Sequence, residues 1–91
     1  MLPAPEYLSA EERESWDELA PLVAPDPVYF AAFESLVCNH ALARRLWASL
    51  KANPGVDGLE DAADKVQTRF ARGLFKFRVP IAAHVRIIER M

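Results

Sequence analysis

The chain has few of the residues and segments that mark the common classes of functional site. Its 91 residues include one cysteine, Cys38, so an intrachain disulfide is excluded. The three glycines, Gly55, Gly58 and Gly73, are scattered and form no glycine-rich loop that could hold a phosphate. No apolar run approaches the ~20 residues that a membrane-spanning helix needs. Residues 1–6 lack the basic and apolar regions of a signal peptide, so we expect a cytoplasmic protein.

Catalytic motifs are also lacking. The sequence has no nucleophile elbow, no P-loop and no pair of histidines at a metal-binding spacing. His40 and His84 are far apart in the chain, and His40 lies in an apolar pattern, which favours a core position over a metal ligand. Cys38 is expected to be a small apolar filler. We therefore expect no enzymatic activity, no cofactor and no metal.

The pattern of apolar residues predicts an all-α fold. No segment alternates polar and apolar residues as a strand does. We predict one domain over 1–91, with two or three main antiparallel helices and a short C-terminal segment. The predicted parts are an extended lead-in over 1–8, helices over 9–20, 27–52 and 57–78, and a terminal segment over 80–91. Because 52% of this short chain is apolar, we also expect a homo-oligomer.

Residues with strong terminal preferences set the predicted helix boundaries. Ser9 and Glu12 have the spacing of a capping box. Pro21 is expected to end or kink the first helix, because proline inside a helix costs ~3 kcal/mol. Asp26 is expected to cap the second helix and Asp57 the third.

The longest apolar pattern lies in the predicted helix over 27–52. Its members are separated by alternating steps of four and three residues, which is a heptad spacing. They are Tyr29, Phe33, Leu36, His40, Ala43, Trp47 and Leu50. We call this set the seam and predict that it lies between copies of the chain, in a coiled-coil contact. On that hypothesis His40 would make assembly pH-sensitive, because burial disfavours its charged form.

The aromatic residues are expected to be structural. Trp16, Trp47, Tyr29 and Phe30 are predicted to anchor the core or an interface. Their spacing does not suggest a platform on which bases could stack.

Charge is distributed unevenly along the chain. Residues 1–39 hold one basic and eight acidic residues, a formal charge of −7, whereas residues 40–91 hold ten basic and five acidic residues, a charge of +5. The total of −2 conceals this separation. A basic half presented on one face can still bind a polyanion, so nucleic acid remains a possible partner.

The basic residues of the second half include a row at helical spacing. Steps of four, three and four residues from position 65 to position 76 place four cations on one face of a helix, where they could meet a row of phosphates. Two arginines near the end of the preceding helix are predicted to extend this patch. The candidate DNA-binding residues are therefore Lys65, Arg69, Arg72, Lys76, Arg44 and Arg45.

Two stretches of the first half form a characteristic pattern. The first is Pro5-Glu6-Tyr7-Leu8-Ser9, followed by Trp16, Leu19, Pro21 and Leu22. The second runs from Asp26-Pro27-Val28-Tyr29 through Phe33 and Leu36 to Ala52-Asn53-Pro54-Gly55. Together they resemble the small terminase subunit family of tailed phages, over about residues 3–55. That family tolerates proline at the position of Pro21 and favours an acidic residue where Tyr29 stands.

The resemblance implies a non-catalytic DNA-packaging adaptor. Small terminase subunits assemble into rings, bind the DNA to be packaged and regulate the large subunit, which holds the ATPase and nuclease. The implied partners are copies of the chain in a ring, the large terminase subunit, which the segment from Pro80 would dock, and double-stranded DNA. Because the chain has no room for a separate helix-turn-helix module, a compact member is implied that binds DNA weakly and without sequence preference, as in a phage-like packaging particle. The implied location is the cytoplasm of a bacterial host cell, with no membrane partner.

Two other hypotheses stay open. In one, the chain is a small phage-encoded inhibitor or interaction module whose acidic stripe, Glu11, Glu14 and Glu18, binds a basic partner protein. In the other, it is a helical assembly protein in which this stripe pairs with the basic row of a neighbouring copy. Most charge runs on helices are solvated or paired with protein, so both hypotheses compete with DNA binding.

Overall fold

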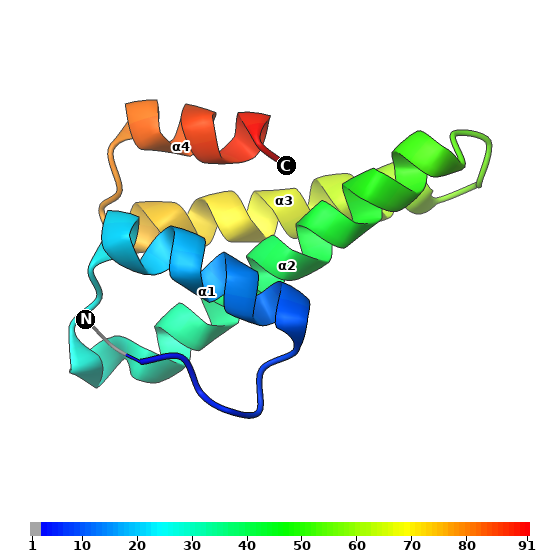
Figure 1. Ribbon diagram of the computed structural model, residues 1–91. Helices are drawn as coiled ribbons and strands as arrows, with labels where there is room; N and C mark the ends of the chain where they lie inside the picture. The colour runs from blue at the N-terminus through cyan, green and yellow to red at the C-terminus, as the bar shows by residue number, and fades with distance from the viewer. Residues whose placement is uncertain (1–2) are drawn as a thin grey trace.

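The computed structural model describes residues 3–91 and is all-α, as predicted (Figure 1). Its elements are α1 (Ala10–Val23), the 3-10 turn η1 (Pro27–Tyr29), α2 (Phe30–Ala52), α3 (Leu59–Lys76) and α4 (Ile81–Glu89). Helices α2 and α3 form a long antiparallel hairpin whose loop end projects from the body. Helix α1 lies across α2, and α4 lies along α3. No helix in this described part of the chain is long and apolar enough to cross a membrane.

The N-terminal segment is docked against the helices. Residues 1–2 of the predicted lead-in lie outside the described residues. The prediction of an extended lead-in is wrong at 6–8, where the chain turns and Leu8 becomes buried. The Arg13 guanidinium donates to the Pro5 carbonyl (3.3 Å), and the Tyr7 hydroxyl donates to the Glu34 carboxylate on α2. These contacts supply the bonds that stabilise the turn.

Helix α1 begins as predicted and ends later. The Ser9 hydroxyl accepts from the Glu12 amide (3.1 Å), and the Glu12 carboxylate accepts from the Ser9 amide (2.9 Å), which confirms the capping box. The helix continues through Pro21 to Val23, so the predicted end at residue 20 is wrong. Because Pro21 stands in the last turn, its missing amide removes only one helical hydrogen bond. Ala24 then ends the helix with φ of +46°.

The starts of α2 and α3 differ from prediction by two or three residues. The Asp26 carboxylate accepts from the Val28 amide (3.0 Å), but it caps the 3-10 turn, and α2 begins only at Phe30. Asp57 does not cap α3. The N-cap is Gly58, whose φ of +80° suits glycine, and it makes no side-chain cap bond.

The predicted seam lies in the core of the chain itself. Phe33, Leu36, His40 and Ala43 are at most 2% exposed, because α1 and α3 cover α2 on two sides. The indole of half-buried Trp47 donates to Gln67 on α3 (2.8 Å), half-buried Leu50 continues the seam, and Tyr29 is 57% exposed. The prediction that the seam faces a second copy is therefore wrong for its four buried residues. A heptad spacing indicates that helices pack along a stripe, and here the partner helices belong to the same chain.

His40 of α2 contacts residues of both α1 and α3. Its Nδ1 lies 2.7 Å from the Ser15 hydroxyl on α1, and its ring lies 4.9 Å from that of Phe70 on α3. Burial, together with the nearby charge of Arg44, lowers the pKa of His40 from 6.5 to about 4. Since His40 is enclosed within one chain, its protonation opposes folding and does not act at an interface between copies.

We expect acid to destabilise the fold through His40. Below pH 6.5 the unfolded chain takes up a proton that folded His40 accepts only near pH 4. The free energy of unfolding should therefore fall as the pH drops from 6.5 to about 4, by up to about 3 kcal/mol. Urea unfolding of the wild type and His40→Gln across this range measures the effect. The two profiles should converge at low pH, and parallel profiles would contradict the assignment.

Gly73 sets the distance between α2 and α3. A Cβ added at Gly73 would lie 2.6 Å from Cδ1 of Leu36, which is 2% exposed. Overpacking of a core costs about 1–3 kcal/mol, which exceeds the ~1 kcal/mol that alanine gains over glycine in a helix. Glycine at this position therefore allows the two helices to pack closely.

We predict that Gly73→Ala lowers the free energy of unfolding by about 1 kcal/mol. In a Leu36→Ala background the obstruction is absent, and the same substitution should then stabilise the chain. Urea denaturation of the four variants tests this reversal of sign. An effect of equal sign and size in both backgrounds would show that Leu36 does not limit the approach.

Candidate nucleic-acid interface

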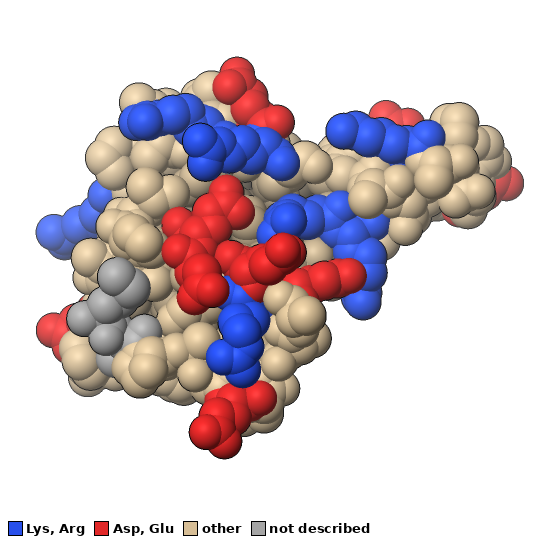
Figure 2. Space-filling view, viewed as in Figure 1, with Lys and Arg blue, Asp and Glu red and all other residues tan. Residues whose placement is uncertain are grey.

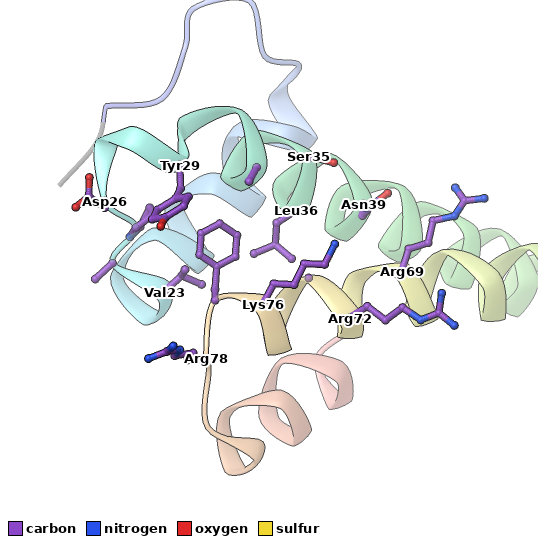
Figure 3. Close-up of a pocket in the computed structure, with 15 residues that line it drawn as sticks. Val23, Asp26, Tyr29, Ser35, Leu36, Asn39, Arg69, Arg72, Lys76 and Arg78 are labelled. Atoms are coloured by element: carbon purple, nitrogen blue, oxygen red, sulfur yellow. The ribbon is translucent and has the colours of Figure 1, made fainter.

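A groove of about 970 Å³ lies between α3 and the segment that connects α1 to α2 (Figure 3). Arg69, Arg72 and Lys76 leave α3 in a row along one wall, and we call these three residues the basic row. Ser35 and Asn39 of α2 lie on the opposite wall. The groove is partly open to solvent.

The sequence of α3 explains why the basic row faces outward. The apolar residues Val66, Phe70 and Leu74 are at most 6% exposed and fix the inner face of the helix. The basic row is spaced by three and four residues, so it occupies a different face from this apolar stripe. All three cations are exposed. The prediction of a rigid row of cations is met at these positions.

Ion pairing separates the predicted cations into two groups. Lys65 pairs with Asp61 one turn earlier (3.0 Å), and Arg44 pairs with Glu14 on α1 (3.6 Å). Among residues 3–91, no carboxylate lies within ion-pair distance of Arg69, Arg72 or Lys76. Charges without a protein partner remain available to an anionic ligand. Of the predicted patch, the basic row and Arg45 therefore remain without an ion pair among residues 3–91.

Arg44 and Arg45 do not extend the patch as predicted. Both belong to α2, but they face α1 and not the groove beside α3. Arg45 lines a second, smaller hollow of about 350 Å³, together with Glu11 and Glu12. Helix α2 turns these side chains away because its own inner face is already occupied by the seam. Lys65 also lies outside the groove.

The acidic stripe covers α1. Figure 2 shows acidic side chains gathered over this helix, with basic side chains around them. Glu11 and Glu14 are exposed and Glu18 is half-buried. Within one chain the stripe meets Arg44 of α2 and does not reach the basic row of α3. The acidic stripe and the basic row therefore lie on different helices, whereas Arg44 and Arg45 lie beside α1.

The Cys38 thiol is held in its protonated form. The Cys38 thiol donates to the Glu12 carboxylate (3.1 Å), and burial together with this acceptor raises the pKa of Cys38 to about 11. The thiol is therefore protonated at neutral pH. In the part of the chain that the structure describes, no group of three or more His, Cys, Asp or Glu residues is placed to hold a metal ion.

Tyr29 and Arg78 both line the groove, although neither was among the DNA-binding residues predicted from the sequence. Tyr29 was assigned to the seam, but its position in η1 turns it toward the groove, where its ring meets that of Phe77 edge to face (6.4 Å between centroids, 85°). Arg78 follows α3 and lines the same end of the groove. The heptad spacing continues without a break to Tyr29, so only the neighbouring Pro25 and Pro27 signalled that Tyr29 lies in a turn.

Arg78 has an unusual backbone conformation for an arginine. Its φ is +57°, in the left-handed region that glycine normally occupies after a helix. The Arg78 amide bonds to the Phe75 carbonyl (2.9 Å) and the Val79 amide to the Leu74 carbonyl (3.0 Å), which together form a Schellman motif. A non-glycine residue in this conformation costs about 1–2 kcal/mol. Arginine is thus present at a position where glycine would fold more easily.

Comparison with known proteins identifies no relative. No protein-family model matches the chain, and no curated protein or solved structure matches it either. The resemblance to small terminase subunits therefore stays a prediction from residues 3–55, and the geometry described above is the basis on which function is argued.

Proposed function

We propose that the chain is a non-catalytic, DNA-binding adaptor of the small terminase subunit type. The basic row of α3 would contact the phosphate backbone, copies of the chain would assemble into a ring, and the assembly would recruit or regulate a large terminase subunit. The observation that carries the DNA-binding part is the absence of ion pairs at Arg69, Arg72 and Lys76 among residues 3–91.

The spacing of the basic row suits a phosphate backbone. Arg69 and Lys76 are seven residues apart, which corresponds to about 10 Å along a helix at 1.5 Å per residue. Successive phosphates of one DNA strand are about 3.4 Å apart along the axis, so the row spans roughly three of them. The total charge of −2 and the acidic face on α1 oppose tight binding. Weak, salt-sensitive binding without sequence preference is the expected result.

We predict that replacing the basic row with alanine flattens the salt dependence of DNA binding. Each phosphate contact contributes about 0.9 to the slope of log K against log salt for duplex DNA. Arg69→Ala/Arg72→Ala/Lys76→Ala should therefore reduce that slope by about 2–3. Fluorescence anisotropy of a labelled duplex at several salt concentrations measures this.

The matched control removes the same charge elsewhere. Lys51, Arg86 and Arg90 are exposed and do not line the groove. Their triple alanine variant should keep the wild-type slope to within about one. Equal losses in the two triple variants would mean that net charge, and not the groove, governs binding.

The assembly part of the proposal needs a surface other than the seam. Phe75, Ile81 and Val85 are 60%, 68% and 49% exposed around the turn from α3 to α4. Ile81 and Val85 lie four residues apart on the outer face of α4, and the Phe75 ring contacts His84 beside them (4.6 Å). Exposed apolar side chains in such a cluster are typical of protein contact surfaces. We propose that this apolar patch carries the contact between copies.

We expect the wild type to form an oligomer larger than a dimer at micromolar concentration. The Phe75→Asp variant should form a smaller oligomer, because the aspartate charge would be buried in the contact between copies. Multi-angle light scattering gives the mass directly. Val28→Asp is the control, since Val28 is 77% exposed but lies in η1, outside the patch. A wild-type monomer would exclude a ring adaptor.

The second candidate function is an inhibitor or interaction module that uses α1. The observation in its favour is the concentration of exposed carboxylates on that helix (Figure 2). It requires a monomer or dimer that ignores DNA and binds a basic partner protein. The salt titration and the mass measurement therefore distinguish it from the adaptor.

A further inference from the structure

We propose that the end of the groove formed by Tyr29, Phe77 and Arg78 binds an unpaired base and its phosphate, so that the groove prefers single-stranded to double-stranded DNA. The inference rests on the proposed DNA-binding function and adds a structural preference to it. It also differs from the expectation that the aromatic residues offer no stacking platform.

The two walls of the groove differ in chemistry. The α3 wall carries the basic row, whereas the opposite wall carries Ser35 and Asn39, which can donate and accept hydrogen bonds, and one acid, Asp26. Asp26 repels phosphate, and one of its oxygens already accepts from the Val28 amide. A strand in the groove would therefore follow α3 with its phosphates and turn its bases toward α2 and η1. Proteins that bind single strands combine a cationic track and an aromatic surface in this way.

Tyr29 supplies the aromatic surface. It is 57% exposed although its ring is held by the edge-to-face contact with Phe77. The 3-10 turn that carries it begins at Pro27 and is capped by Asp26, so the backbone beneath the ring is well defined. An aromatic side chain that is both fixed and exposed loses little conformational freedom when a base stacks on it.

Arg78 adds a fourth cation to the lining of the groove. It lines the groove next to Phe77, and among residues 3–91 no carboxylate pairs with it. The left-handed turn that it occupies would be satisfied at lower cost by glycine. A cation just after a helix C-terminus interacts favourably with the helix dipole, and the Arg78 guanidinium also adds a positive charge to the groove, where it can bind a phosphate.

Paired bases cannot stack on Tyr29. The groove has a volume of about 970 Å³, at the upper end of the ~300–1,000 Å³ that ligand pockets occupy, so it has room for an unpaired base. In a duplex the bases are stacked inside and only their edges are accessible in the grooves. A duplex can therefore reach the basic row with its phosphates but cannot place a base on Tyr29.

The test compares three labelled probes by fluorescence anisotropy at low salt: a 12-nucleotide oligothymidine, an abasic strand of equal length, and a 12-base-pair duplex. The wild type should bind oligothymidine about tenfold more tightly than the abasic strand, because base stacking on an aromatic side chain supplies such a factor. Tyr29→Leu should lose this preference and keep its affinity for the other two probes. Tyr29→Trp should retain the preference.

The Arg78→Gly variant distinguishes the contribution of Arg78 to DNA binding from its contribution to stability. It should keep or raise the midpoint of thermal unfolding, because glycine suits the turn, and should lower the salt slope for oligothymidine by about 0.7. Tyr7→Leu is the control for Tyr29, since Tyr7 is an exposed tyrosine that lies outside the groove.

Two outcomes overturn the inference in different ways. If the wild type binds oligothymidine and the abasic strand equally, or if Tyr29→Leu retains the preference, then Tyr29 is not a stacking surface, while phosphate binding by the basic row still stands. If the wild type binds none of the three probes, the proposed DNA-binding function fails as well.

Discussion

The burial of α2 between helices on two sides is the constraint on which the rest of the structure depends. A chain of this length has a small core, and α2 contributes its longest apolar stripe. Trp16 of α1 packs edge to face on Phe33 (4.7 Å), and Gly73 of α3 lets that helix approach Leu36 closely. The buried hydrogen bond between Ser15 and His40 aligns α1 on the same stripe. These contacts fix the orientation of every other surface.

The positions of the charges follow from that packing. Once α3 turns Phe70 and Leu74 toward α2, its cations must face outward along the groove. Once α1 turns Trp16 and Leu19 inward, its carboxylates form an acidic surface, where Glu14 pairs with Arg44 of α2. The same packing brings η1, which precedes α2, beside the end of α3. Tyr29 and Arg78, far apart in the sequence, therefore line the same groove.

Local signals in the sequence predicted local structure well, and long-range arrangement less well. The capping box at Ser9 and the Asp26 cap depend on residues within three positions, and both form. The heptad spacing of the seam correctly indicated helix packing, but a spacing cannot tell whether the partner helix belongs to the same chain. The direction of Arg44, the exposure of Tyr29 and the left-handed Arg78 depend on how separate elements meet, and no pattern along the sequence encodes that meeting.

The central claim is that the groove beside α3 is the nucleic-acid surface of this protein. Amide and arginine side-chain resonances observed by heteronuclear NMR during titration with oligothymidine test it most directly. We expect the largest shift changes at Arg69, Arg72, Arg78 and the η1 amides, with little change along α1. Changes centred on Glu11 to Glu18, or spread evenly over all exposed cations, would contradict the claim.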